Sequence, residues 1–469
     1  MTEVERPIRV WPQAPVRRAL AVVTACALAV TTVAPAWAQD MPRGLPLIRD
    51  AELEQLLRDY TQPILKAAGL AQQNIRVIII HDRSFNAFVM DGRRIFVNAG
   101  ALMESTVPNQ IIGVLAHETG HIAGGHLSRL REQLAQAQSQ MIIAMLLGIG
   151  AMVAASKSGR DVGNPSAAML GPQSMIQRSL LSYQRAQEEQ ADRAGVKFLN
   201  ETRQSPKGMH DTFKRMADQI LFVATGADPY TQSHPMPAER VSALAIYAKT
   251  SPYWDTKDSA ELQLRHDMAR AKLVGFLERR DTVARKYPTT DNSLPARYAR
   301  AIATYRHSDL RVAVTQIDAL INDMPNNPYL YELKGQALLE GGKAAEAIEP
   351  LRRAVKMAPN PALIQVMLAQ AINSLNNAKL ADEAVTLLRT ALAREPEIPE
   401  AYSQLAMAFG RKGDLAQADL ASAQAAFTRS DYKTARELAS RAKTRFAVGS
   451  PGWVKADDIA SFKPPAGMR

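Results

Sequence analysis

The carboxyl-terminal half of this chain repeats itself with a fixed period. Small or apolar residues followed by a proline recur with identical spacing in three sets: Ala313, Ile317, Leu320 and Pro325; Ala347, Leu351, Ala354 and Pro359; and Ala384, Leu388, Ala391 and Pro396. The first two sets lie 34 residues apart, which is the period of the tetratricopeptide repeat, a pair of antiparallel helices. One such pair cannot bury its apolar face alone, so the sequence predicts helix pairs stacked into a solenoid whose concave surface binds a partner.

Differences between the units predict the turns and ends of this solenoid. Gly335 falls where the repeat places its helix-packing glycine, and the third set follows the second by 37 residues, so residues 373–379 are expected to hold a short insertion. A weaker fourth unit passes through Tyr402, Leu405, Phe409 and Ala418, and a closing helix through Ala435, Ala439 and Ala442. We therefore expect a repeat domain over 260–448 and a tail over 449–469. Three matching sets disfavour the alternative, a generic helical bundle.

The amino-terminal segment has the pattern of an export signal. A basic stretch ends in Arg17-Arg18, an apolar run covers 19–33, and Ala36-Trp37-Ala38 suits cleavage before Gln39. We expect a signal peptide over 1–38, cleaved near Ala38, with an uncleaved membrane anchor as the alternative. No later apolar segment is long enough to span a bilayer, which argues against an integral-membrane protein.

Composition restricts the kind of metal site and partner. Cys26, the only cysteine, lies in the expected signal peptide, so a metal in the mature chain would use histidine and carboxylate ligands. The formal charge is +11, and removal of residues 1–38, with four Arg and two Glu, leaves about +9. The basic residues are scattered and no nucleic-acid motif accompanies them, so we expect a solvated basic surface and no nucleic-acid partner.

The 469 residues exceed one typical core, so a second domain is expected before the repeats. Helical spacing of apolar residues predicts an entry helix over 47–69, and residues 76–81 read as a strand. Residues 87–90 pair with 94–97 across the turn Asp91-Gly92. The edge of this small sheet either receives an extended substrate as an added strand or only packs under the next helix.

Residues 141–155 carry no charged side chain and are too few to cross a bilayer comfortably. They predict a buried hairpin or an apolar lid, with the Gly- and Pro-rich stretch 156–173 as its flexible continuation. Peripheral contact with a membrane surface is the alternative.

Two motifs carry the chemistry. His117-Glu118-Thr119-Gly120-His121 lies in a predicted helix over 109–131, where the two histidines share a face and Glu118 is rotated toward the place of a metal-bound water. Glu188-Glu189-Gln190-Ala191-Asp192 lies in a later helix expected over about 175–199. Zinc in hydrolases takes three protein ligands and keeps one position for water, so the motifs together predict a zinc site.

Glu188 is the preferred third ligand. Asp192 lies one helical turn after Glu188 and can accept the spare N–H of a ligand imidazole, a partner that the register alternative Glu189 lacks. His126 is a rival ligand, but Leu127 occupies the ligand position of the H-E-x-x-H-x-x-G-x-x-H pattern. On a continuous helix His126 faces away from His117, and we expect a structural role for it.

These motifs, with Gly195 and the run His234-Pro235-Met236-Pro237 followed by Glu239 and Arg240, resemble the gluzincin metalloproteases that include HtpX and the CAAX prenyl endopeptidases. The repeats and the signal peptide are similar to the periplasmic, BepA-like branch. The resemblance implies a mainly α (α+β) protein: a zincin-type metalloprotease domain with a small β-sheet over 39–255, followed by the tetratricopeptide-repeat solenoid.

The resemblance also implies a function. It makes the chain a periplasmic endopeptidase of outer-membrane protein quality control, with misfolded or stalled outer-membrane proteins as substrates and the β-barrel assembly machinery bound through the repeats. It assigns one zinc ion per chain to His117, His121 and Glu188, and the role of general base to Glu118.

Two further roles follow from the resemblance and stay open. His234 is implied as a switch that occupies the fourth zinc position, although the sequence alone suggests a surface histidine. Arg240 either steadies an oxyanion or forms a structural ion pair. The competing function is a chaperone or scaffold with a latent protease site, against which the intact Glu118 argues.

Overall fold

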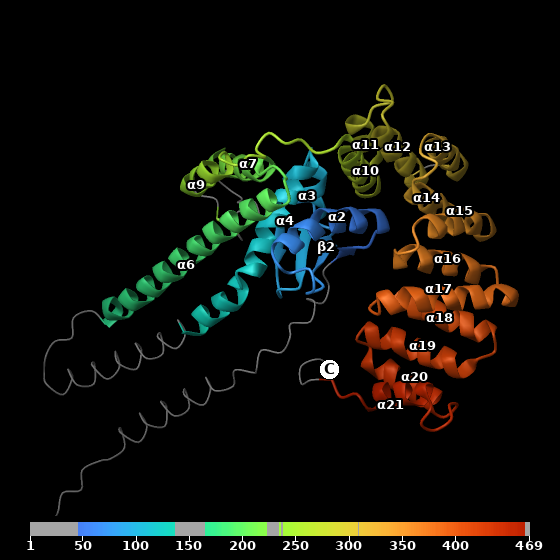
Figure 1. Ribbon diagram of the computed structural model, residues 1–469. Helices are drawn as coiled ribbons and strands as arrows, with labels where there is room; N and C mark the ends of the chain where they lie inside the picture. The colour runs from blue at the N-terminus through green and yellow to red at the C-terminus, as the bar shows by residue number, and fades with distance from the viewer. Residues whose placement is uncertain (1–45, 137–164, 223–233, 236–237, 308, 465–469) are drawn as a thin grey trace, which may run out of the picture. The chain divides into compact units, whose positions relative to one another are not determined.

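The computed structural model describes residues 46–136, 165–222, 234–235, 238–307 and 309–464 (Figure 1). The predicted signal peptide and the apolar segment 141–155 lie outside the described residues. The described residues are mainly helical and contain one small sheet, as expected. Among the helices of the described ranges, none is both long and apolar enough to cross a membrane.

The sheet has the strand order β1-β2-β4-β3, formed by β1 (Leu47–Ile48), β2 (Arg76–Ile80), β4 (Arg94–Asn98) and β3 (Ala87–Val89). β2 and β4 are parallel, whereas β3 and β4 form an antiparallel hairpin in which Phe88 pairs with Phe96. Gly92 turns the hairpin with φ of 74°, a conformation that glycine adopts without strain. The hairpin predicted across Asp91-Gly92 is therefore confirmed.

The entry helix begins later than the sequence predicted. Residues 47 and 48 are extended and pair with β2 as strand β1. Helix α2 (Ala51–Ala67) starts after Asp50, whose side chain accepts a hydrogen bond from the backbone N–H of Leu53. This N-cap sets the helix start, so the prediction of a helix from residue 47 was wrong by four residues.

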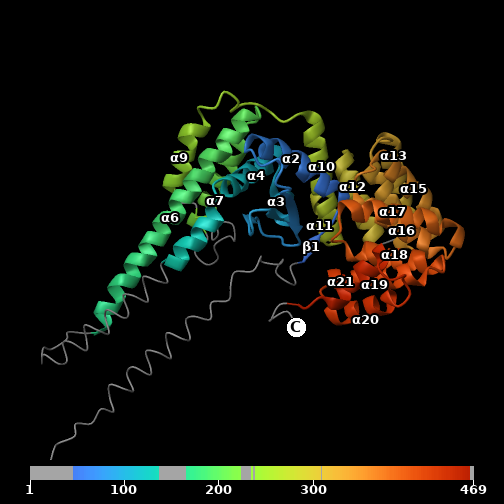
Figure 2. The same ribbon diagram turned by 60° about the horizontal axis from the view of Figure 1, so that its bottom comes forward.

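Helix α4 (Pro108–Ala123) is the centre of the amino-terminal part. It follows α3 (Ala99–Glu104), and it contacts the sheet, α2, α6 (Pro165–Glu201) and α7 (Lys207–Phe222). Its apolar residues Ile111 and Leu115 are fully buried in the same core as Ile95 of β4. Figure 2 shows α6 running alongside α4, with α9 (Ala238–Ala248) beside α6 and α7.

Two predicted helix boundaries were wrong. Helix α4 does not continue to residue 131, because the chain turns at Gly124 and Gly125, where Gly125 has φ of 63°, before helical conformation resumes at His126. Helix α6 begins at Pro165, so residues 165–173 are helical and not part of a flexible loop. Proline suits the first turn of a helix, where its missing N–H has no partner to lose.

The repeat region is a succession of antiparallel helices, stacked pair on pair in Figure 1. Its elements are α10 (Ala260–Leu277), α11 (Arg280–Lys286), α12 (Leu294–His307), α13 (Leu310–Asp323), α14 (Pro328–Glu340), α15 (Ala344–Met357), α16 (Ala362–Ser374), η1 (Ala378–Leu380), α17 (Ala381–Arg394), α18 (Pro399–Arg411), α19 (Leu415–Thr428), α20 (Tyr432–Lys443) and α21 (Pro451–Ser461).

The residues that defined the repeat are the ones that hold the helix pairs together. The small and apolar members of the three sets all have an exposed fraction of 0%. Gly335 packs against Leu351 so closely that a Cβ atom at 335 would overlap the leucine side chain. The insertion expected over 373–379 is a turn with Asn376 at φ of 52°, followed by η1.

A buried charge cluster joins α2 to the first repeat helices. Lys272 of α10 is 3% exposed, and its Nζ lies 2.7 Å from Asp50 Oδ2 and 3.2 Å from Glu52 Oε2. The hydroxyl of Tyr298 in α12 donates to Glu52 at 2.9 Å, and the buried Glu332 of α14 lies in the same electrostatic environment. Removing one member of such a cluster leaves an uncompensated buried charge.

The substitution Lys272→Met should destabilise the protein by about 3–5 kcal/mol, because it strands the Asp50 and Glu52 carboxylates without a cation. Denaturant unfolding measures the loss. The exposed Lys356 provides the control, since Lys356→Met should change stability by less than about 0.5 kcal/mol. Equal stability of the two variants would contradict a linking role for Lys272.

Glu332 predicts a pH dependence of stability. Burial raises its pKa to about 8, although Lys272 opposes the shift. A folded-state pKa above the unfolded value means that the folded state binds more protons, so this stabilising contribution is complete below about pH 4 and is lost as pH rises toward about 8. Wild type should therefore lose stability relative to Glu332→Gln between about pH 5 and about pH 8 in denaturant unfolding. The exposed Glu437→Gln should follow wild type; a parallel course of wild type and Glu332→Gln would refute the assignment.

Candidate metal centre

Helix α4 presents the first motif from within the core. His117 and Glu118 both have an exposed fraction of 0%, while His121 near the end of the helix is partly buried. Pro108 starts the helix, and the side-chain oxygen of Gln110 accepts a hydrogen bond from the Thr106 N–H at 2.7 Å. The packing that buries α4 therefore also fixes the direction of its polar side chains.

Helix α6 reaches the motif because small residues line the contact between the two helices. A Cβ atom on Gly120 would lie 2.8 Å from the carbonyl oxygen of Ala191, and one on Gly195 would lie 3.2 Å from the backbone nitrogen of His117. Ala191 itself is fully buried. The two backbones are thus nearly in contact, which brings Glu188 to the histidines of α4.

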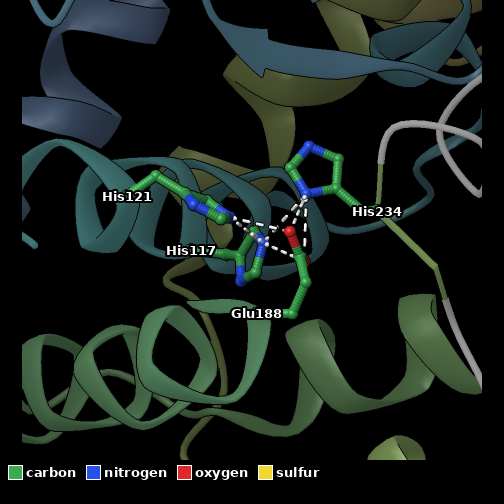
Figure 3. A group of neighbouring side chains, drawn as sticks. All are labelled: His117, His121, Glu188 and His234. Atoms are coloured by element: carbon green, nitrogen blue, oxygen red, sulfur yellow. Dashed lines mark hydrogen bonds and ion pairs between the residues drawn. The ribbon is translucent and has the colours of Figure 1, made fainter. Parts of the chain in front are cut away.

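Four side chains converge on one point, as Figure 3 shows. The ligand atoms of His117, His121, Glu188 and His234 all lie within 4.8 Å of one another. His117 Nε2 and His121 Nε2 are 3.0 Å apart. Each of these nitrogens lies 3.4 Å from an oxygen of Glu188. The structure brings together these predicted residues from α4, α6 and the segment before α9.

His234 is buried and bridges two parts of the site. Its Nδ1 lies 3.1 Å from both oxygens of Glu188 and 3.4 Å from His117 Nε2. Its other nitrogen, Nε2, lies 3.4 Å from Glu118 Oε1. With an exposed fraction of 6%, it is not the surface histidine that the sequence alone suggested.

Asp192 and Arg240 contact members of this cluster and hold them in place. Asp192 Oδ1 lies 2.9 Å from His117 Nδ1, where it can accept the imidazole proton. Arg240 donates through Nε and Nη2 to the two oxygens of Asp192, at 2.7 and 2.8 Å, and its Nη1 lies 2.7 Å from Glu188 Oε2. Nη1 also donates to the carbonyl of Pro235 at 3.0 Å. This geometry favours the ion-pair alternative for Arg240.

The register alternative Glu189 points elsewhere. It is exposed and pairs with Arg193 of the same helix at 2.7 Å. His126, in contrast, lies closer to the site than expected: its Nδ1 is 3.0 Å from Nδ1 of His121. The expectation that His126 faces away from His117 assumed a continuous helix, whereas the chain turns at Gly124 and Gly125 and brings His126 against His121.

Burial and charge perturb the groups of the cluster. Burial lowers the pKa of His117, but hydrogen bonding to Asp192 and Glu188 outweighs it and raises the value to about 9. Burial raises the pKa of Glu188, yet the surrounding histidines hold it well below its usual value. Burial also raises the pKa of Glu118, whose oxygens accept no hydrogen bond from the described residues. A carboxylate with a raised pKa and free acceptor sites suits proton transfer.

The donor set fits a divalent metal ion. Ligands about 2.0–2.1 Å from a tetrahedral zinc are roughly 3.3 Å apart, and the separations of 3.0–3.4 Å within this cluster agree with that spacing. Two imidazole Nε2 atoms and one carboxylate are directed at the same buried point. All of them donate an electron pair when the imidazoles are neutral and the carboxylate is ionised. A cation between them satisfies all of these donors.

One neighbour of the site had no motif to indicate it. The ring of Phe213 in α7 meets His117 edge-on, with centroids 5.3 Å apart, and Arg240 lies over the same ring at 5.4 Å. The only sequence signal at Phe213 is its place in the apolar spacing of a helix. All core residues share that signal, so it could not identify Phe213 as a neighbour of the site.

Gly120→Ala should destabilise the protein by about 1–3 kcal/mol and weaken zinc binding, because the added methyl group pushes α6 away from α4 and moves Glu188 from the histidines. Competition with a chromophoric chelator measures the zinc affinity. Gly410→Ala in α18 is the matched control, since nothing lies within 4 Å of its Cβ position. Zinc binding as tight in Gly120→Ala as in Gly410→Ala would show that the close helix contact does not control the site.

Comparison with known proteins places these features in a family context. Residues 28–248 match the model of peptidase family M48, and residues 298–361 match a tetratricopeptide-repeat model. The chain is 23% identical over 426 residues to the beta-barrel assembly-enhancing protease of Yersinia pestis, covering 88% of this chain and 84% of the relative. The protein of that name from Escherichia coli K12 is 23% identical over 70% of this chain and 66% of its own length. The metalloprotease LoiP of Escherichia coli K12 is 31% identical over 147 residues, 31% of this chain and 51% of the relative.

Proposed function

We propose that this chain, an M48-type metallopeptidase with tetratricopeptide repeats, is a zinc-dependent endopeptidase. The observation that carries the proposal is the convergence of His117, His121, Glu188 and His234 within 4.8 Å, beside the buried Glu118. The match to peptidase family M48 supports a metal-dependent hydrolase, and the donor set of imidazoles and carboxylate suits zinc.

His117, His121 and Glu188 would hold one zinc ion per chain. When bound, zinc acts as a Lewis acid that lowers the pKa of water to about 7. Glu118 is the general base in this proposal, since its carboxylate lies next to the cluster and has free acceptor sites for a proton. Asp192 holds the imidazole of His117, and Arg240 holds Asp192 and Glu188 in place.

His234 is the proposed switch. Its Nδ1 lies among the ligand atoms and its Nε2 lies against Glu118, so the imidazole fills the space that water needs between the ligands and the base. In this arrangement the site is latent. Activity requires His234 to leave, together with the Pro235 carbonyl that Arg240 binds.

The name of these relatives, beta-barrel assembly-enhancing protease, supports a role for this chain in outer-membrane protein assembly. The export-signal pattern over 1–38 supports a location in the periplasm. The substrates would be misfolded or stalled outer-membrane proteins, and the repeats would bind the β-barrel assembly machinery or its clients. Residues 141–155 remain a candidate for peripheral membrane contact, on the sequence alone.

A second candidate function is a chaperone or scaffold with a latent protease site. The occupied position of His234 favours it, because a permanently blocked site would leave only the binding function of the repeats. The two functions differ in their dependence on Glu118.

The test is proteolysis of an unfolded β-barrel outer-membrane protein by the purified mature chain, with zinc content measured for each variant. Glu118→Gln should abolish cleavage, by at least about a hundredfold, while zinc stays bound, because the base is lost and the ligands remain. His234→Ala should increase cleavage, because the fourth position opens.

Exposed residues of the same types serve as matched controls: Glu189→Gln and His81→Ala should cleave as wild type does. Zinc bound at one equivalent with no cleavage by any form, His234→Ala included, would favour the scaffold. Cleavage that survives in Glu118→Gln would refute the proposed base.

A further inference from the structure

The turn after α4 returns a third histidine to the motif helix. Gly124 caps α4, and Gly125 takes the left-handed conformation with φ of 63°, which favours glycine. His126 follows directly and is 3% exposed. A Cβ atom on Gly124 would overlap Nε2 of His126, so only glycine at 124 leaves room for the imidazole to fold back over the helix end.

The returned imidazole contacts the face of His121 that is turned away from the metal cluster. The two Nδ1 atoms lie 3.0 Å apart, and the rings meet edge-on with centroids 5.0 Å apart. His121 Nε2 points the other way, 3.0 Å from His117 Nε2 and 3.4 Å from Glu188 Oε1.

A hydrogen bond between two Nδ1 atoms needs one proton. A neutral imidazole that gives its Nε2 lone pair to a metal carries its proton on Nδ1. His121 is then the donor and Nδ1 of His126 the acceptor. The two motif histidines therefore have different partners: Asp192 faces Nδ1 of His117, and a neutral imidazole faces Nδ1 of His121.

The position of His126 is held from helix α6. The side-chain amide of Gln187 donates to the backbone carbonyl of His126 at 3.2 Å, and Gln187 is itself 6% exposed. Gln187 immediately precedes Glu188 in α6. The same helix thus supplies a cluster residue and anchors the turn that carries His126.

We propose that His126 is the positioning residue of His121: by accepting the Nδ1 proton, it fixes the tautomer and the ring orientation that direct Nε2 into the cluster. The Gly124-Gly125 turn is the element that makes this contact sterically possible. The inference rests on the proposed function, since it requires a divalent metal at the cluster.

The test measures metal binding directly. The dissociation constant for Zn²⁺ is determined by chelator competition, and Co²⁺ is used as a spectroscopic probe of ligand geometry. His126→Phe keeps an aromatic ring at this position but removes the nitrogen that accepts the hydrogen bond. It should weaken Zn²⁺ binding about ten- to a hundredfold and shift the visible absorption bands of bound Co²⁺.

Two amide variants at position 126 distinguish loss of the hydrogen bond from a change in side-chain volume. The carbonyl oxygen of Asn lies near the position of an imidazole Nδ1, whereas that of Gln reaches toward the position of Nε2. His126→Asn should therefore keep an affinity and a Co²⁺ spectrum close to wild type, and His126→Gln should behave as His126→Phe does. Gly124→Ala retains the imidazole but displaces it, and should also weaken binding, with Gly410→Ala as its control.

The outcomes distinguish the two proposals. Absence of metal binding by wild type would overturn the proposed function, and this inference with it. Tight binding by wild type, His126→Phe and His126→Gln alike would overturn only the role of His126. Binding by His126→Asn as weak as by His126→Phe would also overturn it, because the acceptor would then not be what matters. If His126→Phe fails to fold by circular dichroism, the Asn and Gln pair decides.

Discussion

The near-contact between the backbones of α4 and α6 is the constraint on which the site depends. Gly120, Ala191 and Gly195 leave no side-chain volume between the helices. At this separation the Glu188 carboxylate lies 3.4 Å from Nε2 of each motif histidine. The same contact brings Asp192 to His117, and it allows Gln187 to anchor the turn that carries His126. The candidate metal site, its supporting residues and the helix packing are therefore one structural unit.

Buried charge is arranged in connected sets in this protein. Arg240 pairs with the carboxylates of Glu188 and Asp192 in α6 and also binds the Pro235 carbonyl, so one residue positions the candidate ligands and holds the segment of His234. Lys272 does the same for Asp50 and Glu52 where α2 meets the repeat helices. Each cation is desolvated, and each is compensated by more than one acceptor, as buried charges require. The proposed catalytic site and the first repeat helices thus share one hydrophobic core, which runs from α2 to α14.

Much of this architecture was predictable because its signals are local. The nine small and apolar repeat residues are fully buried. The period of 34 residues predicted this, because it arises from the packing of successive helix pairs. The hairpin at Asp91-Gly92 follows from turn chemistry that four residues contain. The choice of Glu188 over Glu189 came from helical spacing to Asp192. In the structure Glu188 is buried beside the motif histidines, whereas Glu189 is exposed. The boundary expected at 255–260 remains a prediction.

By itself, the sequence determined the repeats, the hairpin and the identity of the residues that gather at the candidate metal centre. Only the tertiary structure decided what those residues touch. The pairing of His126 with His121, the double contact of Arg240 with Asp192 and Glu188, and the position of His234 between ligands and base all join segments that are separate in the chain or separated by a turn. A helical period assumes that a helix continues, and one glycine with positive φ at 125 redirects all that follows. Such contacts depend on where each helix ends in the packed structure, and a local sequence pattern does not contain that information.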